Sequence, residues 1–68
     1  MNNETLAAEI LNEANDNDGI KRLVCRKNGN IAVTYNNGFN NEWLASYGGG
    51  QWDAKTVRNL IIKAEQGL

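Results

Sequence analysis

Two glycine-containing turns in the middle of the chain constrain its fold more than any other feature. Asn28-Gly29 and Asn36-Asn37-Gly38 are each flanked by residues that favour strands. Asparagine followed by glycine is the strongest short-range hairpin signal, because both residues tolerate a positive φ angle. The sequence therefore predicts an antiparallel, three-stranded meander. Its expected strands are residues 20–27, 30–36 and 39–47.

The length of the first turn sets the register expected for the first hairpin. A two-residue loop at Asn28-Gly29 pairs Lys27 with Asn30 and places Val24 opposite Val33. In this register neither face of the ribbon is wholly apolar or wholly polar. The pattern leaves open which face of the sheet is buried.

The second turn allows two registers, of which one suits the side chains better. A two-residue loop would place the carboxylate of Glu42 opposite an apolar residue. We therefore favour a three-residue loop with Gly38 as a bulge residue, because it brings aromatic side chains together across the strands. It pairs Tyr35 with Phe39 and Ile31 with Trp43. Residues 42–47 also suit a short helix, which is the main alternative for that segment.

An amphipathic helix is expected before the meander, over residues 4–14. Its apolar side chains recur at the spacing of one helix face. They are Leu6, Ala7, Ile10, Leu11 and Ala14. Asn2 or Asn3 can cap its first turn. The polar side chains expected to face water are Glu9, Asn12 and Glu13.

A second helix is expected after the meander, over residues 54–66. Asp53 is a good N-cap, and Trp52 before it can pack on Val57 as a hydrophobic staple. The expected buried stripe is Val57, Leu60, Ile61 and Ala64. Residues 1–68 thus read as a single α+β domain of order α-β-β-β-α, with both helices packed on one face of the sheet.

The composition offers few ways to reinforce so small a core. Cys25 is the only cysteine, so no internal disulfide forms, and a chain without histidine makes a poor zinc site. A homo-oligomer or a bound partner is therefore a candidate source of extra stability. The single thiol suits a reducing cytoplasm, and no apolar run approaches the length of a membrane span, so we expect no membrane contact.

No segment matches a catalytic or cofactor-binding motif. Gly48-Gly49-Gly50 lacks the residues that follow the glycines of a phosphate loop, and Asp16 and Asp18 lack the other ligands of a calcium loop. Without histidine, Cys25 has no usual general base. A chain this small is also not expected to hold a deep pocket of the usual size, about 300–1,000 Å³. We therefore expect no enzyme, no cofactor and no metal.

The distribution of charge is the strongest functional signal. Residues 1–19 carry five acids and no base, whereas residues 20–68 carry seven bases and three acids. Four of the bases fall in the first expected strand, as Lys21, Arg22, Arg26 and Lys27. All five aromatic residues lie between positions 35 and 52. A basic strand beside aromatic side chains is typical of a nucleic-acid-binding sheet.

Two resemblances, both without a shared motif, suggest different partners. In element order, residues 20–66 resemble the sheet-reading DNA-binding domains of some phage integrases and plant transcription factors. In size, acidity and style, the chain looks like the inhibitors that phages and mobile elements encode against host machinery, including anti-CRISPR proteins.

The leading hypothesis from the sequence is a small, non-enzymatic protein-binding module that acts as an inhibitor or modulator. Tryptophan and tyrosine dominate binding hot spots, and an acidic helix can enter a basic groove on a partner. The expected protein contacts are Trp43, Tyr47, Trp52, Glu9 and Glu13. The alternative is a nucleic-acid-binding module whose contacts are Lys21, Arg22, Arg26 and Lys27.

Overall fold

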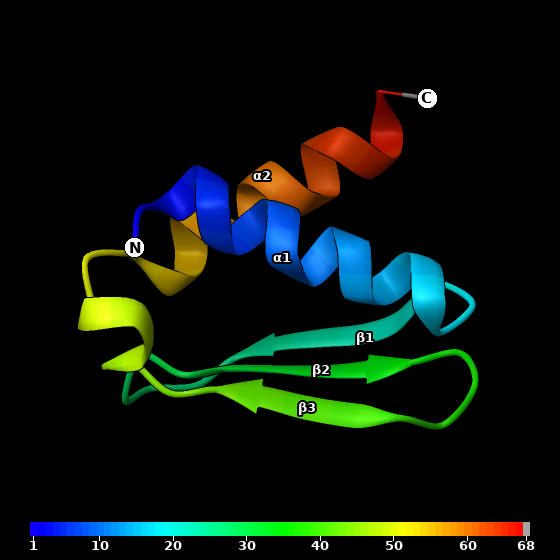
Figure 1. The fold of residues 1–68 in the computed structure, drawn as a ribbon, viewed down its shortest axis with the longest axis horizontal. Helices are drawn as coiled ribbons and strands as arrows, with labels where there is room; N and C mark the ends of the chain where they lie inside the picture. The colour runs from blue at the N-terminus through cyan, green and yellow to red at the C-terminus, as the bar shows by residue number, and fades with distance from the viewer. Residues whose placement is uncertain (68) are drawn as a thin grey trace.

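Two helices lie on one face of a three-stranded antiparallel sheet (Figure 1). The computed structural model describes residues 1–67. Its elements are α1 (Asn3–Asp16), β1 (Ile20–Cys25), β2 (Ile31–Tyr35), β3 (Asn40–Trp43), the 3-10 turn η1 (Tyr47–Gly49) and α2 (Ala54–Gln66). This confirms the predicted α+β class and the α-β-β-β-α order. Among the described residues, no helix has both the length and the apolar character that crossing a membrane requires.

The first hairpin has a three-residue loop, so the predicted register is wrong by one residue. The backbone N–H of Arg26 donates to the carbonyl of Asn30 at 2.8 Å, where Lys27 was expected to pair. Gly29 has a φ of 95°, but Asn28 does not have the positive φ that the predicted two-residue turn requires. Asn28 instead uses its side-chain oxygen to accept a hydrogen bond from Asn30 N at 3.1 Å.

The corrected register decides which face of β1 is buried. Leu23 and Cys25, rather than Val24, lie on the face that packs against the helices. The register shifts again between Ile20 and Arg22, where one extra residue of β1 is accommodated, so that Ile20 also faces the core. On β2 the buried side chains are Ile31, Val33 and Tyr35.

The second hairpin has the predicted three-residue loop. Tyr35 N donates to the carbonyl of Phe39 at 2.8 Å, and the two rings stack with their centroids 6.0 Å apart. Ile31 lies opposite Trp43, as predicted. β3 nevertheless ends at Trp43, so both a strand to residue 47 and a helix over 42–47 are wrong. The side-chain oxygen of Asn30 accepts a hydrogen bond from Ala45 N at 2.8 Å and holds the turn that follows β3.

The core fills the space between the helices and the sheet. Its buried apolar residues are Leu6, Ala7, Ile10, Ala14, Ile31, Val33, Tyr35, Trp43, Ala54, Val57 and Ile61. Ala64 was expected among them but is exposed. Figure 1 gives the reason, since α2 rises away from the sheet towards its C-terminal end.

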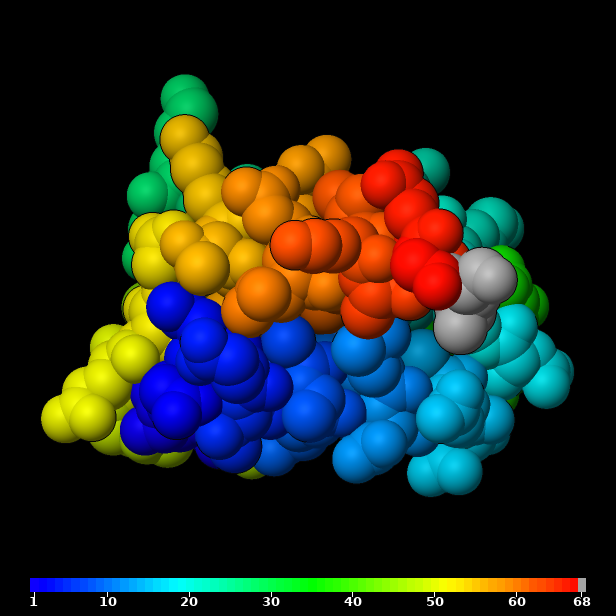
Figure 2. Space-filling model, turned by 90° about the horizontal axis from the view of Figure 1, so that it is seen from above, coloured from blue at the N-terminus to red at the C-terminus, as the bar shows by residue number. Residues whose placement is uncertain are grey.

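The helices lie side by side and begin at the same end of the molecule (Figure 2). Asn2 caps α1 by accepting a hydrogen bond from Thr5 N at 2.8 Å, and Asp53 caps α2 by accepting one from Thr56 N at 3.0 Å. The side chain of Asn3 joins the two starts by accepting a hydrogen bond from Asp53 N at 2.7 Å. These contacts fix where α2 begins relative to α1.

Candidate binding surface

Glu9 and Glu13 hold α1 against the sheet, so the prediction that they face water is wrong. The indole N–H of Trp43 donates to Glu9 at 2.8 Å. The hydroxyl of Tyr35 and the side-chain amide of Asn41 donate to Glu13 at 2.9 and 3.0 Å. Trp43 is itself only 4% exposed. These three predicted protein contacts are therefore engaged inside the fold.

Helical spacing alone could not identify this use of the two carboxylates. Both glutamates border the apolar stripe of α1, where a side chain turns towards water unless a partner stands opposite. The partners are supplied by strands far along the chain. Burial, followed by the hydrogen bond to Glu13, raises the pKa of Tyr35 above its ordinary value.

The other two predicted protein contacts lie close together at the end of β3. Tyr47 is 41% exposed, and its hydroxyl donates to Glu9 at 3.3 Å. Trp52 is half-buried, and its indole N–H donates to the carbonyl of Tyr47 at 2.9 Å. Leu44 precedes them and is the most exposed of the large apolar side chains at 57%. This small apolar group is open to solvent.

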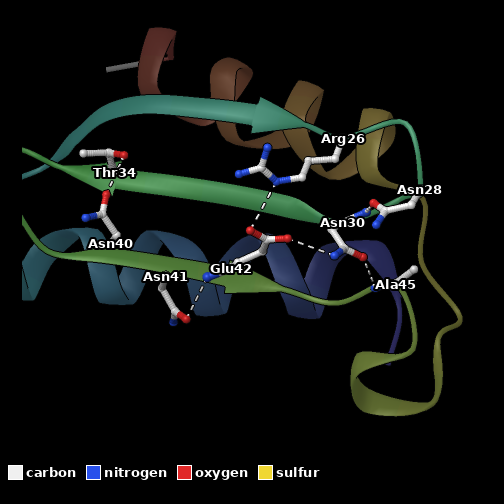
Figure 3. Close-up of polar contacts among 8 residues, drawn as sticks. All are labelled: Arg26, Asn28, Asn30, Thr34, Asn40, Asn41, Glu42 and Ala45. Atoms are coloured by element: carbon white, nitrogen blue, oxygen red, sulfur yellow. Dashed lines mark hydrogen bonds and ion pairs between the residues drawn. The ribbon is translucent and has the colours of Figure 1, made fainter.

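The outer face of the sheet, which the helices do not cover, carries Arg26 (Figure 3). Arg22 and Val24, two residues apart in β1, are both exposed on this face. Arg26 points across the face to Glu42. The Arg26 Nε atom lies 3.2 Å from one Glu42 oxygen, and the amide of Asn30 donates to the other at 2.9 Å. The amide first, and then the guanidinium, lowers the pKa of Glu42.

The fold places all the basic residues on two neighbouring elements. They are Lys21, Arg22, Arg26 and Lys27 in the first hairpin and Lys55, Arg58 and Lys63 in α2. All seven side chains are exposed. The thiol of Cys25 in β1 lies 3.5 Å from the carbonyl of Ala54, which shows that the two elements touch.

We call residues 20–29 and 53–67 the basic side. With its two acids, Asp53 and Glu65, the basic side carries a net charge of +5, whereas the rest of the chain carries six acids and no base. Among the described residues, Arg26 is the only base with a carboxylate within 4 Å. The remaining six bases keep their charge available to a partner.

A hollow of about 590 Å³ lies on the basic side, between the turn of the first hairpin and the start of α2. Figure 2 shows these two segments next to one another. Arg26, Lys27 and Lys55 line the hollow together with Trp52. Its volume is within the usual range for ligand sites, about 300–1,000 Å³, but the hollow is open to solvent and is not a deep pocket.

Two ionisable side chains that line the hollow have shifted pKa values. Burial raises the pKa of the Cys25 thiol, although the charge of Arg58 opposes this, and a protonated thiol is a weak nucleophile. Within residues 1–67, no three histidine, cysteine, aspartate or glutamate side chains gather as a metal site requires. Asp53 supplies a carboxylate there, but hydrogen bonds from Thr56, the backbone one first, hold it at the helix start and lower its pKa.

Comparison with protein-family models, with curated proteins and with solved structures gives no significant match. The candidate surface therefore depends on geometry alone. The sequence indicated the exposed bases of the first hairpin, but it carried no signal that α2 would lie beside β1. That placement joins Lys55 and Arg58 to the same surface.

Proposed function

We propose that this protein is a small, non-enzymatic module that binds nucleic acid through its basic side. The observation that carries this proposal is the gathering of seven exposed bases on β1, its turn and α2. Neutralising phosphates with lysine and arginine supplies most of the sequence-independent affinity for nucleic acids. The net charge of −1 does not oppose this, because six of the eight acids belong to α1, the turn after it and β3.

The outer sheet face adds polar side chains next to the basic strand. Thr34 and Asn40 lie on this face, and the Thr34 hydroxyl donates to the Asn40 side chain at 2.8 Å (Figure 3). Hydroxyl and amide groups of this kind contact phosphates and base edges in complexes with nucleic acids. We place this activity in the cytoplasm, where a single thiol such as Cys25 stays reduced.

Fluorescence anisotropy with short labelled DNA, single-stranded and duplex, tests the proposal. We expect binding at about 50 mM salt that weakens steeply towards 200 mM. Arg22→Ala should weaken binding to every sequence and reduce the salt slope by about one, because one phosphate contact is lost. Asn12→Ala, an exposed change on α1, is the matched control and should bind as the wild type does. No binding at low salt, or equal binding by Arg22→Ala, would contradict the proposal.

A protein partner is the second candidate, favoured by the exposed group formed by Leu44, Tyr47 and Trp52. In this reading the chain is an inhibitor or modulator encoded by a phage or mobile element, and a second copy of the chain is one candidate partner. Tyr47→Ala should then abolish capture of a protein that the wild type and Asn12→Ala both retain. Light scattering after size-exclusion chromatography would identify self-association.

A further inference from the structure

The hollow on the basic side combines positive charge with an aromatic ring. Lys27 and Lys55 line it from opposite elements, the first from the hairpin turn and the second from the first turn of α2. Neither lysine has a carboxylate within 4 Å among residues 1–67. With Arg26 and Asp53, the lining carries a net charge of +2. The hollow is therefore suited to an anion.

The ring in the hollow is held in place by the fold. Trp52 packs partly against the core, and its indole N–H is fixed by the carbonyl of Tyr47 at 2.9 Å. An indole that is already positioned loses little conformational freedom when a flat ligand packs against it. Aromatic side chains in positively charged grooves bind unpaired bases by stacking, whatever the sequence.

We propose that this hollow takes one nucleotide of a single-stranded nucleic acid, with the base against Trp52 and the phosphate between Lys27 and Lys55. The proposal rests on the function proposed above and narrows it from nucleic acids in general to single strands. In a duplex the base faces are stacked on one another, and only their edges reach the grooves. An indole in a hollow can therefore meet a base face only in an unpaired strand.

Arg26 has a smaller part in this site than the two lysines. Its Nε atom is held by Glu42 on the outer sheet face at 3.2 Å, so its charge is already partly balanced. Asp53 is held at the start of α2, because one of its oxygens accepts hydrogen bonds from both the backbone and the hydroxyl of Thr56. Its charge acts on Lys55, but within the described chain it forms no ion pair with either lysine. Lys27 and Lys55 thus remain the cations free to hold a phosphate.

Intrinsic tryptophan fluorescence tests the site, with an unlabelled oligothymidine strand as the probe and a DNA duplex of equal length beside it. Trp43 is buried and hydrogen-bonded, so the response of Trp52 dominates. We expect the single strand to quench the fluorescence and to bind more tightly than the duplex. Trp52→Leu should lose about tenfold in affinity, the usual effect of removing one stacked base.

Two lysine variants keep the test valid even if Trp52→Leu fails to fold. Lys55 and Lys63 are both exposed on α2, but only Lys55 lines the hollow. Lys55→Ala and Lys63→Ala remove the same charge, so a larger loss of single-strand affinity in Lys55→Ala supports the site. Equal losses, an unquenched signal on binding, or tighter binding of the duplex would overturn it and leave the proposed function standing. Failure of both probes to bind at low salt would overturn both proposals.

Discussion

Asparagine side chains hold much of this fold together. Nine of the twelve form hydrogen bonds within the described residues, namely Asn2, Asn3, Asn17, Asn28, Asn30, Asn36, Asn37, Asn40 and Asn41. Most of them cap helices or fix turns, where a short amide replaces a missing backbone partner. Asn30 is the most buried, since it binds both Glu42 and the backbone of Ala45. The large number of asparagines, twelve among 68 residues, is therefore explained by the structure.

Tyr35 gives a prediction at the same scale. Its raised pKa means that the fold favours the protonated hydroxyl, which donates to Glu13. The resulting stability is present below the unfolded value of 10.0 and is lost as the pH rises through the higher folded-state pKa. Tyr35→Phe should lower the free energy of unfolding at neutral pH by about 1–2 kcal/mol. It should also reduce the loss of stability in alkaline solution.

Urea unfolding at neutral and alkaline pH measures both effects. Tyr47→Phe is the comparison, because the hydrogen bond to Glu9 also raises the pKa of Tyr47 but its hydroxyl is exposed, so its removal should have the smaller effect. A Tyr35→Phe variant as stable as the wild type, or with an unchanged alkaline loss, would show that the bond to Glu13 has no such role.

At the scale of elements, the two hairpins show what a local pattern can and cannot predict. The second register was predictable, because a three-residue loop pairs Tyr35 with Phe39 and Ile31 with Trp43. The first was predicted wrongly, because Asn-Gly favours a two-residue loop, although a glycine with positive φ such as Gly29 also suits a three-residue loop. The three-residue loop is stabilised by Asn28, whose side-chain oxygen accepts a hydrogen bond from Asn30 N. Because the observed pairing differs from the predicted one by one residue, Leu23 and Cys25 face the core in place of Val24.

The two turn glycines make a matched pair for testing this difference. Gly29 and Gly38 have φ angles of 95° and 93°, so alanine at either position costs about 1–2 kcal/mol of backbone strain. A Cβ at Gly29 would also lie 3.2 Å from Ala45, whereas one at Gly38 would meet nothing within 4 Å. Gly29→Ala should therefore destabilise the protein more than Gly38→Ala in urea unfolding. The reverse order would contradict the packing of the first hairpin against the turn after β3.

At the scale of the whole molecule, function depends on how the elements are placed. The sequence predicted that Lys21, Arg22, Arg26 and Lys27 would share one strand region, and the structure exposes all four. It could not predict that α2 would lie beside β1, since helix amphipathicity does not say which strand a helix covers. Likewise, the sequence pattern predicted that the acids of α1 face water. In the structure, Glu9 and Glu13 accept hydrogen bonds from side chains on β3 and β2. The basic side is therefore a property of the tertiary fold.

Amide chemical shifts, followed by NMR while a short single-stranded DNA is added, locate the surface that binds the strand. We expect the shifts to change along residues 21–29 and at the start of α2, around Trp52, Lys55 and Arg58. The amide signals of α1 should not move. Changes centred on α1 or on Leu44 and Tyr47, or a spectrum that the DNA leaves unaltered, would show that the basic side is not the binding surface.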